Sequence, residues 1–137
     1  YSRRTFLNFK AIAAESAKLV ENFRVKTPTL ETPIKNLSGG NIQKLILARE
    51  LARKPGVLIA AQPTRGVDIG ASEYIHQQLL AQRAAGTAIL LISEDLDEVR
   101  ALSDRIAVMY EGRIVGIVDG RTATAEELGL MMAGVIG

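Results

Sequence analysis

Two short apolar segments separated by a helical segment constrain the fold of this chain most strongly. The residues VLIAA (57–61) and TAILLIS (87–93) are apolar and partly β-branched. Residues 69–86 lie between them, carry apolar side chains at helical spacing, and end at Gly86, a residue that favours a helix stop. A strand, a helix and a strand in this order predict a parallel pair, with each strand buried on both faces. The sequence therefore predicts an α/β fold.

Other elements are expected on either side of this unit, and most carry a recognisable start or stop signal. The polar residues Asn8, Ser38, Asp95 and Thr124 each precede an apolar-periodic segment and are candidate helix N-caps. The expected elements are a helix over 7–23, an extended linker over 24–33, a helix within 36–56, a short helix within 94–104, a hairpin over 105–118 that turns at Glu111 and Gly112, and a last helix around 125–132.

Composition excludes several classes of protein. Apolar residues make up 47% of the 137 and charged residues 23%, which is typical of a globular chain and not of a disordered one. Seventeen basic and fifteen acidic residues are too nearly balanced to indicate nucleic-acid binding. The absence of cysteine excludes disulfides and thiolate metal sites. No apolar run approaches the roughly 20 residues that a membrane-spanning helix needs.

The segment LSGGNIQK (37–44) carries the clearest chemical signal. A serine and two glycines at a helix start leave several backbone N–H groups without partners, and the helix dipole adds positive potential there. The missing side chains allow an anion to approach closely, and the Ser38 hydroxyl can donate to it. An ordinary helix cap with a flexible entrance is the alternative. Taken by itself, the segment is equally consistent with a phosphate site and with an ordinary cap.

Together with four later segments, this one resembles the ATP-binding cassette family. LSGGNIQK is similar to the family's signature motif, and VLIAAQPT is similar to its Walker B strand. RGVD (65–68) is similar to the D-loop, and LLISED (90–95) to the strand before the switch histidine. DRIAVMYEGRIV (104–115) is similar to the C-terminal hairpin. The motifs follow the family's order and spacing from about residue 36 to residue 118.

The resemblance implies an α/β fold of the P-loop NTPase (RecA-like) class. Residues 1–45 are then part of the helical subdomain, including the signature motif, and residues 46–137 are the C-terminal half of the ATPase core. No G-x-x-x-x-G-K-[ST] motif occurs in the chain. In the family this Walker A loop lies upstream, so we expect the chain to be a piece of a longer protein and inactive as an ATPase by itself.

Three positions depart from the family pattern. Ala61 stands where an aspartate positions Mg²⁺, and alanine offers no oxygen to a hard cation. Gln62 stands where a glutamate polarises the attacking water, and an amide cannot accept the proton. Glu94 stands where the switch histidine contacts the γ-phosphate, which a carboxylate repels. We therefore expect no intact catalytic residue and no metal ligand in this chain.

The family's architecture gives such a cassette a role. Two cassettes dimerise head to tail, and each ATP lies between the Walker motifs of one cassette and the signature of the other. The resemblance implies that Gly66 and Asp68 form a D-loop that couples the two sites, although Asp68 could merely cap the next helix. ATP and Mg²⁺ are expected only in the full-length assembly. The residues expected at the partner's ATP are Leu37, Ser38, Gly39, Gly40, Asn41 and Gln43.

The particular residues of these motifs are similar to those of the degenerate second cassette of tandem ATPases that drive bacterial import of simple sugars or nucleosides. The pair Ala61 and Gln62 favours the nucleoside branch, whereas Ile42 departs from the glutamine usual there. The implied partners are a second cassette in the same polypeptide, transmembrane permease subunits and, indirectly, a solute-binding protein, with no nucleic acid. The implied location is peripheral, on the cytoplasmic face of the cell membrane.

Two alternatives stay open at this stage. The chain could belong to a soluble tandem-cassette ATPase that is not coupled to a permease. It could also be a regulatory or scaffold domain that keeps the fold without hydrolysing nucleotide. A permease-docking glutamine loop upstream would separate the importer from the first alternative, and nucleotide binding by the full-length protein would argue against the second.

Overall fold

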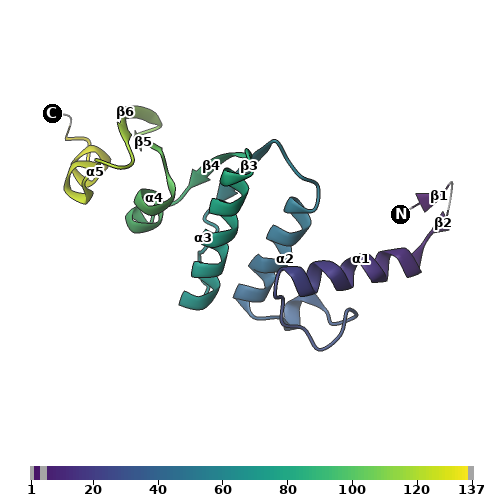
Figure 1. Cartoon of the computed structure of the whole chain (residues 1–137). Helices are drawn as coiled ribbons and strands as arrows, with labels where there is room; N and C mark the ends of the chain where they lie inside the picture. The colour runs from purple at the N-terminus through teal and green to yellow at the C-terminus, as the bar shows by residue number, and fades with distance from the viewer. Residues whose placement is uncertain (1, 4–5, 136–137) are drawn as a thin grey trace. The chain divides into compact units, whose positions relative to one another are not determined.

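The computed structural model of the chain describes residues 2–3 and 6–135. The described residues form two compact units. The first unit contains the residues up to Gly56 together with Pro63–Ala81, and the second contains Val57–Gln62 together with the residues from Gln82 onward. Each unit is described separately below, and Figure 1 labels their helices and strands.

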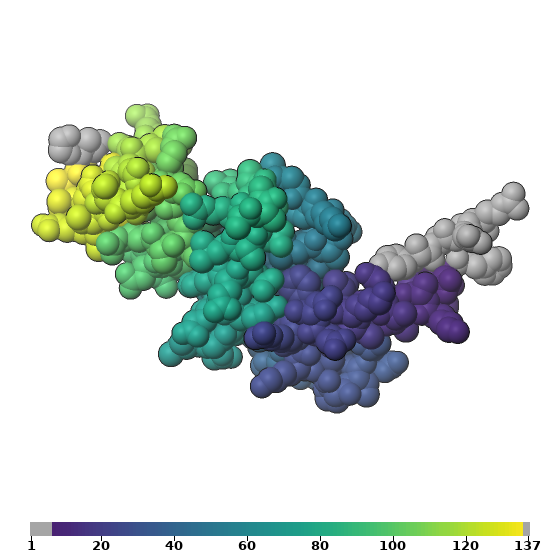
Figure 2. Space-filling model, in the orientation of Figure 1, coloured from purple at the N-terminus to yellow at the C-terminus, as the bar shows by residue number. Residues whose placement is uncertain are grey.

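The first unit is mainly helical. Its first helix begins after Asn8, whose Oδ1 atom accepts a hydrogen bond from the Ala11 N–H at 3.0 Å, as the predicted N-cap requires. A short antiparallel pair, which the sequence does not predict, precedes this helix. Helix α1 contacts α2 (Figures 1 and 2). The elements are β1 (Ser2–Arg3), β2 (Phe6–Leu7), α1 (Phe9–Asn22), the 3-10 helix η1 (Ile34–Asn36), α2 (Gly39–Leu51) and most of α3 (Ile69–Ala84).

A buried tyrosine connects three parts of the first unit. Tyr74 of α3 is 8% exposed, and its hydroxyl donates to the Asn22 carbonyl at the end of α1, with 3.4 Å between the oxygens. The Lys44 ammonium of α2 lies 4.8 Å from the centre of the ring, within cation–π range. Burial raises the pKa of Tyr74 above its usual value, and the nearby Arg24 charge opposes this shift. The neutral phenol is therefore the form that the first unit stabilises.

The second unit contains the predicted parallel pair. Strand β3 (Val57–Ala61) pairs with β4 (Ala88–Ile92) in parallel and in register, from Val57 opposite Ala88 to Ala61 opposite Ile92. The Gln62 N–H donates to the Ile92 carbonyl at 2.7 Å and so extends the ladder by one residue. The prediction of an α/β fold with parallel strands is confirmed.

The expectation that both strands are buried on two faces is wrong for this chain. Val57 and Ile59 of β3 are 67% and 66% exposed, and Leu90 of β4 is 54% exposed, whereas Leu58 is buried. Successive side chains of a strand point to opposite faces. The described residues therefore cover one face of this pair and leave the other open to solvent.

The rest of the second unit follows the predicted hairpin and helices. Strand β5 (Arg105–Tyr110) pairs antiparallel with β6 (Arg113–Asp119). Both turn residues have positive φ, 46° at Glu111 and 76° at Gly112, as a two-residue type I′ turn requires. Helices α4 (Leu96–Leu102) and α5 (Ala125–Met132) begin after Asp95 and Thr124, whose side chains accept first-turn N–H groups.

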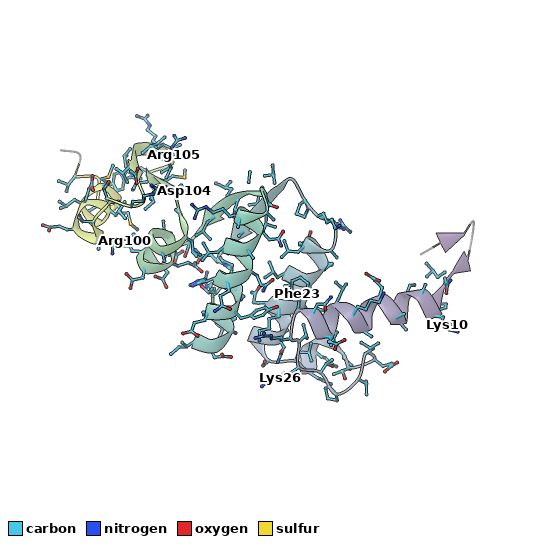
Figure 3. The ribbon with its side chains drawn as sticks, in the orientation of Figure 1. Lys10, Phe23, Lys26, Arg100, Asp104 and Arg105 are labelled. Atoms are coloured by element: carbon cyan, nitrogen blue, oxygen red, sulfur yellow. The ribbon has the colours of Figure 1, made fainter. Side chains whose placement is uncertain are left out.

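The core of the second unit lies between the hairpin and α5. Ile106 and Val108 project from β5, and Leu128 of α5 is fully buried against them. The Arg100 Nε of α4 donates to the Ala123 carbonyl at 3.2 Å, which ties α4 to the segment before α5. Arg100 is labelled in Figure 3 together with Asp104, which pairs with Arg83.

Leu128→Ala tests this core. We expect the substitution to lower the free energy of unfolding by about 2–5 kcal/mol, because it removes a fully buried side chain and leaves a cavity. Urea unfolding of the purified chain measures the change. Leu130→Ala on the same helix is the control, since Leu130 is 49% exposed and its truncation should cost much less. Equal losses in the two variants would contradict the placement of the core.

Candidate functional site

The first turn of α2 presents backbone N–H groups at a polar surface. Ser38 occupies the N-cap position with an extended backbone (φ −66°, ψ 156°), and its carbonyl accepts the Ile42 N–H at 3.0 Å. The position is the one predicted, but the Ser38 side chain makes no capping hydrogen bond. The N–H groups at the start of a helix have no partner within the helix, and the helix dipole places positive potential there. This turn can bind an anion.

The same turn packs closely against residues 66–71. A Cβ atom on Gly39 would lie 3.1 Å from the Gly66 carbonyl oxygen, and one on Gly40 would lie 2.8 Å from Ala71 Cβ. The Gly40 position is also 3.3 Å from Asp68 Oδ2. Glycines are therefore required for this approach. The structure brings together Gly39, Gly40, Gly66 and Asp68, which the sequence assigns to two separate motifs.

Asp68 forms the hydrogen bond expected of a helix cap. Its Oδ1 atom accepts the Ala71 N–H at 2.9 Å in the first turn of α3. Capping is thus its local role here. Its role in coupling two sites stays a prediction.

Asn41 connects the signature to a distant segment of the first unit. Its Oδ1 atom accepts the backbone N–H of Lys26 at 2.8 Å, and its Nδ2 atom donates to Ser38 Oγ at 2.9 Å. Lys26 lies near the start of α2 (Figure 3). The sequence does not predict this contact, because residue 26 lies in the segment expected to be an extended linker.

A hollow of about 360 Å³ opens at this point, and we call it the signature hollow. Two lysines and one carboxylate line it, so basic groups outnumber acidic ones. Leu37 and Gln43, which the sequence also assigns to the partner's ATP, are half-buried and are not among the residues that line the hollow. The groups that carry its chemistry are Lys26, Ser38, Gly40, Asn41, Lys44 and Asp68.

The two lysines of the hollow were not predicted from the sequence. Lys44 belongs to the quoted segment 37–44 and was detectable there, but its position over Tyr74 depends on the tertiary fold. Lys26 gives no signal in the sequence, since a lone lysine beside two threonine–proline pairs is typical of a solvated linker. Together they give the hollow a chemistry suited to a polyanion.

The three departures from the family pattern lie together in the second unit. Ala61 ends β3 opposite Ile92, and Gln62 follows it with a left-handed backbone, φ 49°. Glu94 is exposed, two residues beyond β4. The carboxyl ends of parallel strands meet at one edge of a sheet, so these positions share that edge of the β3–β4 pair. At this edge, Ala61 provides a methyl group and Gln62, just beyond β3, provides an amide.

Residues 2–3 and 6–135 contain no group of three or more histidine, aspartate and glutamate side chains placed to hold a metal ion. Within the same residues, no helix combines the length and the apolar character needed to cross a bilayer.

Comparison with characterised proteins finds relatives along nearly the whole chain. It is 48% identical over 134 residues to the guanosine import ATP-binding protein NupO of Bacillus subtilis (strain 168). It is 47% identical over 133 residues to the nucleoside import ATP-binding protein NupA of Lactococcus lactis subsp. cremoris (strain MG1363). These alignments cover 98% and 97% of the chain but 26% of each relative, so the chain spans about a quarter of their length. No family model matches the sequence.

Solved structures share the fold. A nucleotide-free ATP-binding cassette from an ABC transporter aligns with a TM-score of 0.72 at 24% identity, over 96% of this chain and 50% of that one. A dimeric ATP-binding cassette in a post-hydrolysis state, bound to ADP and phosphate, aligns with a TM-score of 0.71 at 21% identity, over 88% of this chain and 52% of that one. The chain thus has the fold of about half of such a cassette.

Gly40→Ala tests the close approach at the site. The added methyl group would lie 2.8 Å from Ala71 Cβ, so the start of α2 must move, and we expect a loss of about 1–3 kcal/mol in the free energy of unfolding. Gly70→Ala is the control, because its methyl group would meet only Asp68 Oδ1, at 3.5 Å. Alanine also favours a helix over glycine, so the control should be neutral or slightly stabilised. Urea unfolding compares the variants, and equal stability would contradict the packing described.

Proposed function

Because this chain belongs to the ATP-binding cassette family, we propose that it is the C-terminal part of a degenerate second cassette in an importer ATPase. The relatives are named as import proteins for guanosine, nucleosides and glucose. The solute class we propose is accordingly nucleosides or simple sugars. The pair Ala61 and Gln62 favours nucleosides within that class.

The observation that carries the proposal is the anion-binding turn at Ser38. Its N–H groups without partners inside the helix, the Ser38 hydroxyl and the two lysines of the signature hollow suit a terminal phosphate. The chain has no Walker A loop of its own in the printed sequence, so the phosphate is one that another cassette holds. The role of this chain is to complete that cassette's ATP site.

The chain's own site has the opposite character. A methyl group at Ala61 cannot bind Mg²⁺, and the Gln62 amide cannot act as a general base. Glu94 adds a negative charge at the same edge of the β3–β4 pair. This site is therefore proposed to hold nucleotide without turning it over.

The partners and location follow from the proposal. In the complete polypeptide, ATP and Mg²⁺ are the cofactors, and hydrolysis takes place at the site that the first cassette provides. The cassette pair would act on transmembrane permease subunits that receive solute from a binding protein. The chain would lie peripherally at the cytoplasmic face of the membrane. We also propose that Asp68, which lies beside Gly40, couples the two ATP sites.

Gly39→Asp in the complete polypeptide tests the role of the signature. A carboxylate in the first turn of α2 would repel the phosphate, and we expect steady-state ATPase activity to fall about 100-fold or more. Gly129→Asp on α5 is the matched control, since a Cβ atom there meets nothing within 4 Å. Normal ATP turnover by the Gly39→Asp variant would refute the proposed role.

Restoring the missing acids tests the degenerate site. We expect the double substitution Ala61→Asp and Gln62→Glu to restore little hydrolysis there, because Glu94 still opposes the phosphate. Adding Glu94→His should raise turnover above that of the double variant. ATPase activity is measured with the first cassette's own catalytic glutamate replaced, so that only the restored site contributes. Full activity in the double variant would show that Glu94 has no influence.

A further inference from the structure

The orientation of the Asn41 amide is determined by one neighbour. The Lys26 backbone N–H can only donate, so the Asn41 atom 2.8 Å from it must be the carbonyl oxygen. The Nδ2 atom therefore faces Ser38, and its N–H group donates to Ser38 Oγ at 2.9 Å. The usual ambiguity between the two ends of an asparagine amide is thereby removed.

This orientation fixes the role of the Ser38 hydroxyl. Its oxygen accepts from Asn41, so its proton is left to donate elsewhere. Ser38 is exposed and lines the signature hollow, so its hydroxyl can donate that proton to a group bound there. A hydroxyl that accepts on one side is also a better donor on the other, because hydrogen bonds in a chain polarise one another.

We propose that Asn41 is a positioning residue that sets the Ser38 hydroxyl as a donor toward the terminal phosphate of a nucleoside triphosphate. The inference rests on the proposed function, in which the signature hollow receives that phosphate. Asn41 acts through Ser38 and is anchored by the Lys26 N–H, which lies 15 residues earlier in the chain. The loop that carries Lys26 is therefore part of the phosphate site's support.

The geometry also explains why an amide suits this position. An aspartate has the same size but offers only acceptors, so the Ser38 hydroxyl would turn and donate to it. An alanine would leave the Lys26 N–H and the Ser38 oxygen without this partner. Only a group with one acceptor and one donor satisfies both neighbours and leaves the hydroxyl proton free.

A double-mutant cycle in the complete importer ATPase tests the inference. We expect Asn41→Ala alone to lower kcat/KM for ATP about fivefold, the effect of one hydrogen bond. In a Ser38→Ala background, the same substitution should cost nothing further, because Asn41 acts through Ser38. Asn36→Ala, an exposed asparagine two residues before Ser38, is the control and should change nothing. Losses that add fully in the double variant would overturn the inference.

Two measurements that do not depend on turnover accompany the cycle. Hydrogen exchange of the Lys26 amide should be faster in Asn41→Ala than in the wild type, and unchanged exchange would overturn the anchor. The ATP concentration that half-saturates closure of the cassette pair, followed by fluorescence energy transfer, should rise about fivefold in Asn41→Ala. It should rise further in Asn41→Asp, and wild-type closure by that variant would also overturn the inference.

The outcomes separate the two proposals. If Ser38→Ala leaves ATP-driven closure and ATPase activity intact, the proposed function fails, and this inference fails with it. If Ser38→Ala impairs both while Asn41→Ala is silent, the proposed function stands and only the role of Asn41 is overturned. An impaired Asn41→Ala variant that is silent in the Ser38→Ala background supports both.

Discussion

The close approach of the first turn of α2 to residues 66–71 is the constraint on which the site depends. A Cβ atom would be 2.8 Å from Ala71 Cβ at Gly40, so something would have to shift, and at Gly39 it would be tightly placed, 3.1 Å from the Gly66 carbonyl oxygen. The same absence of side chains leaves the N–H groups of this turn accessible to an anion. Close packing and anion binding therefore both favour glycine at these positions. A substitution there that disturbs the packing would also change the proposed phosphate site. Gly66 and Asp68 are held beside the start of α2 by this contact.

The signature groups and the replaced catalytic positions lie in different units. The first unit contains the signature hollow, Gly66 and Asp68, the groups that we propose act on another cassette's nucleotide. The second unit contains Ala61, Gln62 and Glu94, which offer no catalytic group of the family type. If the cassette had simply lost its function by drift, we would not expect it to keep the glycines of one unit while the acids of the other are lost. Retention beside loss supports a cassette that works for its partner.

Local signals in the sequence predicted the parts of the fold that depend on neighbouring residues. The caps at Asn8, Asp95 and Thr124, and the turn at Glu111, involve atoms a few residues apart and were recognisable as patterns. The bond from Lys26 to Asn41 joins residues 15 apart through a segment without periodicity, so no pattern could reveal it. The division into residues 1–45 and 46–137 stays a prediction. Exposure of Val57 was missed because an apolar run indicates a buried strand only when enough chain covers it.

Asp68 is an acid in the lining of the hollow that we propose receives a phosphate. Its Oδ1 atom accepts the Ala71 N–H at 2.9 Å, so its charge is directed into the positive end of α3. Among the described residues, the Lys44 ammonium has no such partner from a helix end. The Lys44 ammonium lies over the Tyr74 ring, which is apolar and cannot neutralise it. Because α3 engages Asp68 and Lys44 lies over a ring, the hollow still attracts an anion. We propose that the Ser38 hydroxyl then orients that anion by donating a hydrogen bond to it.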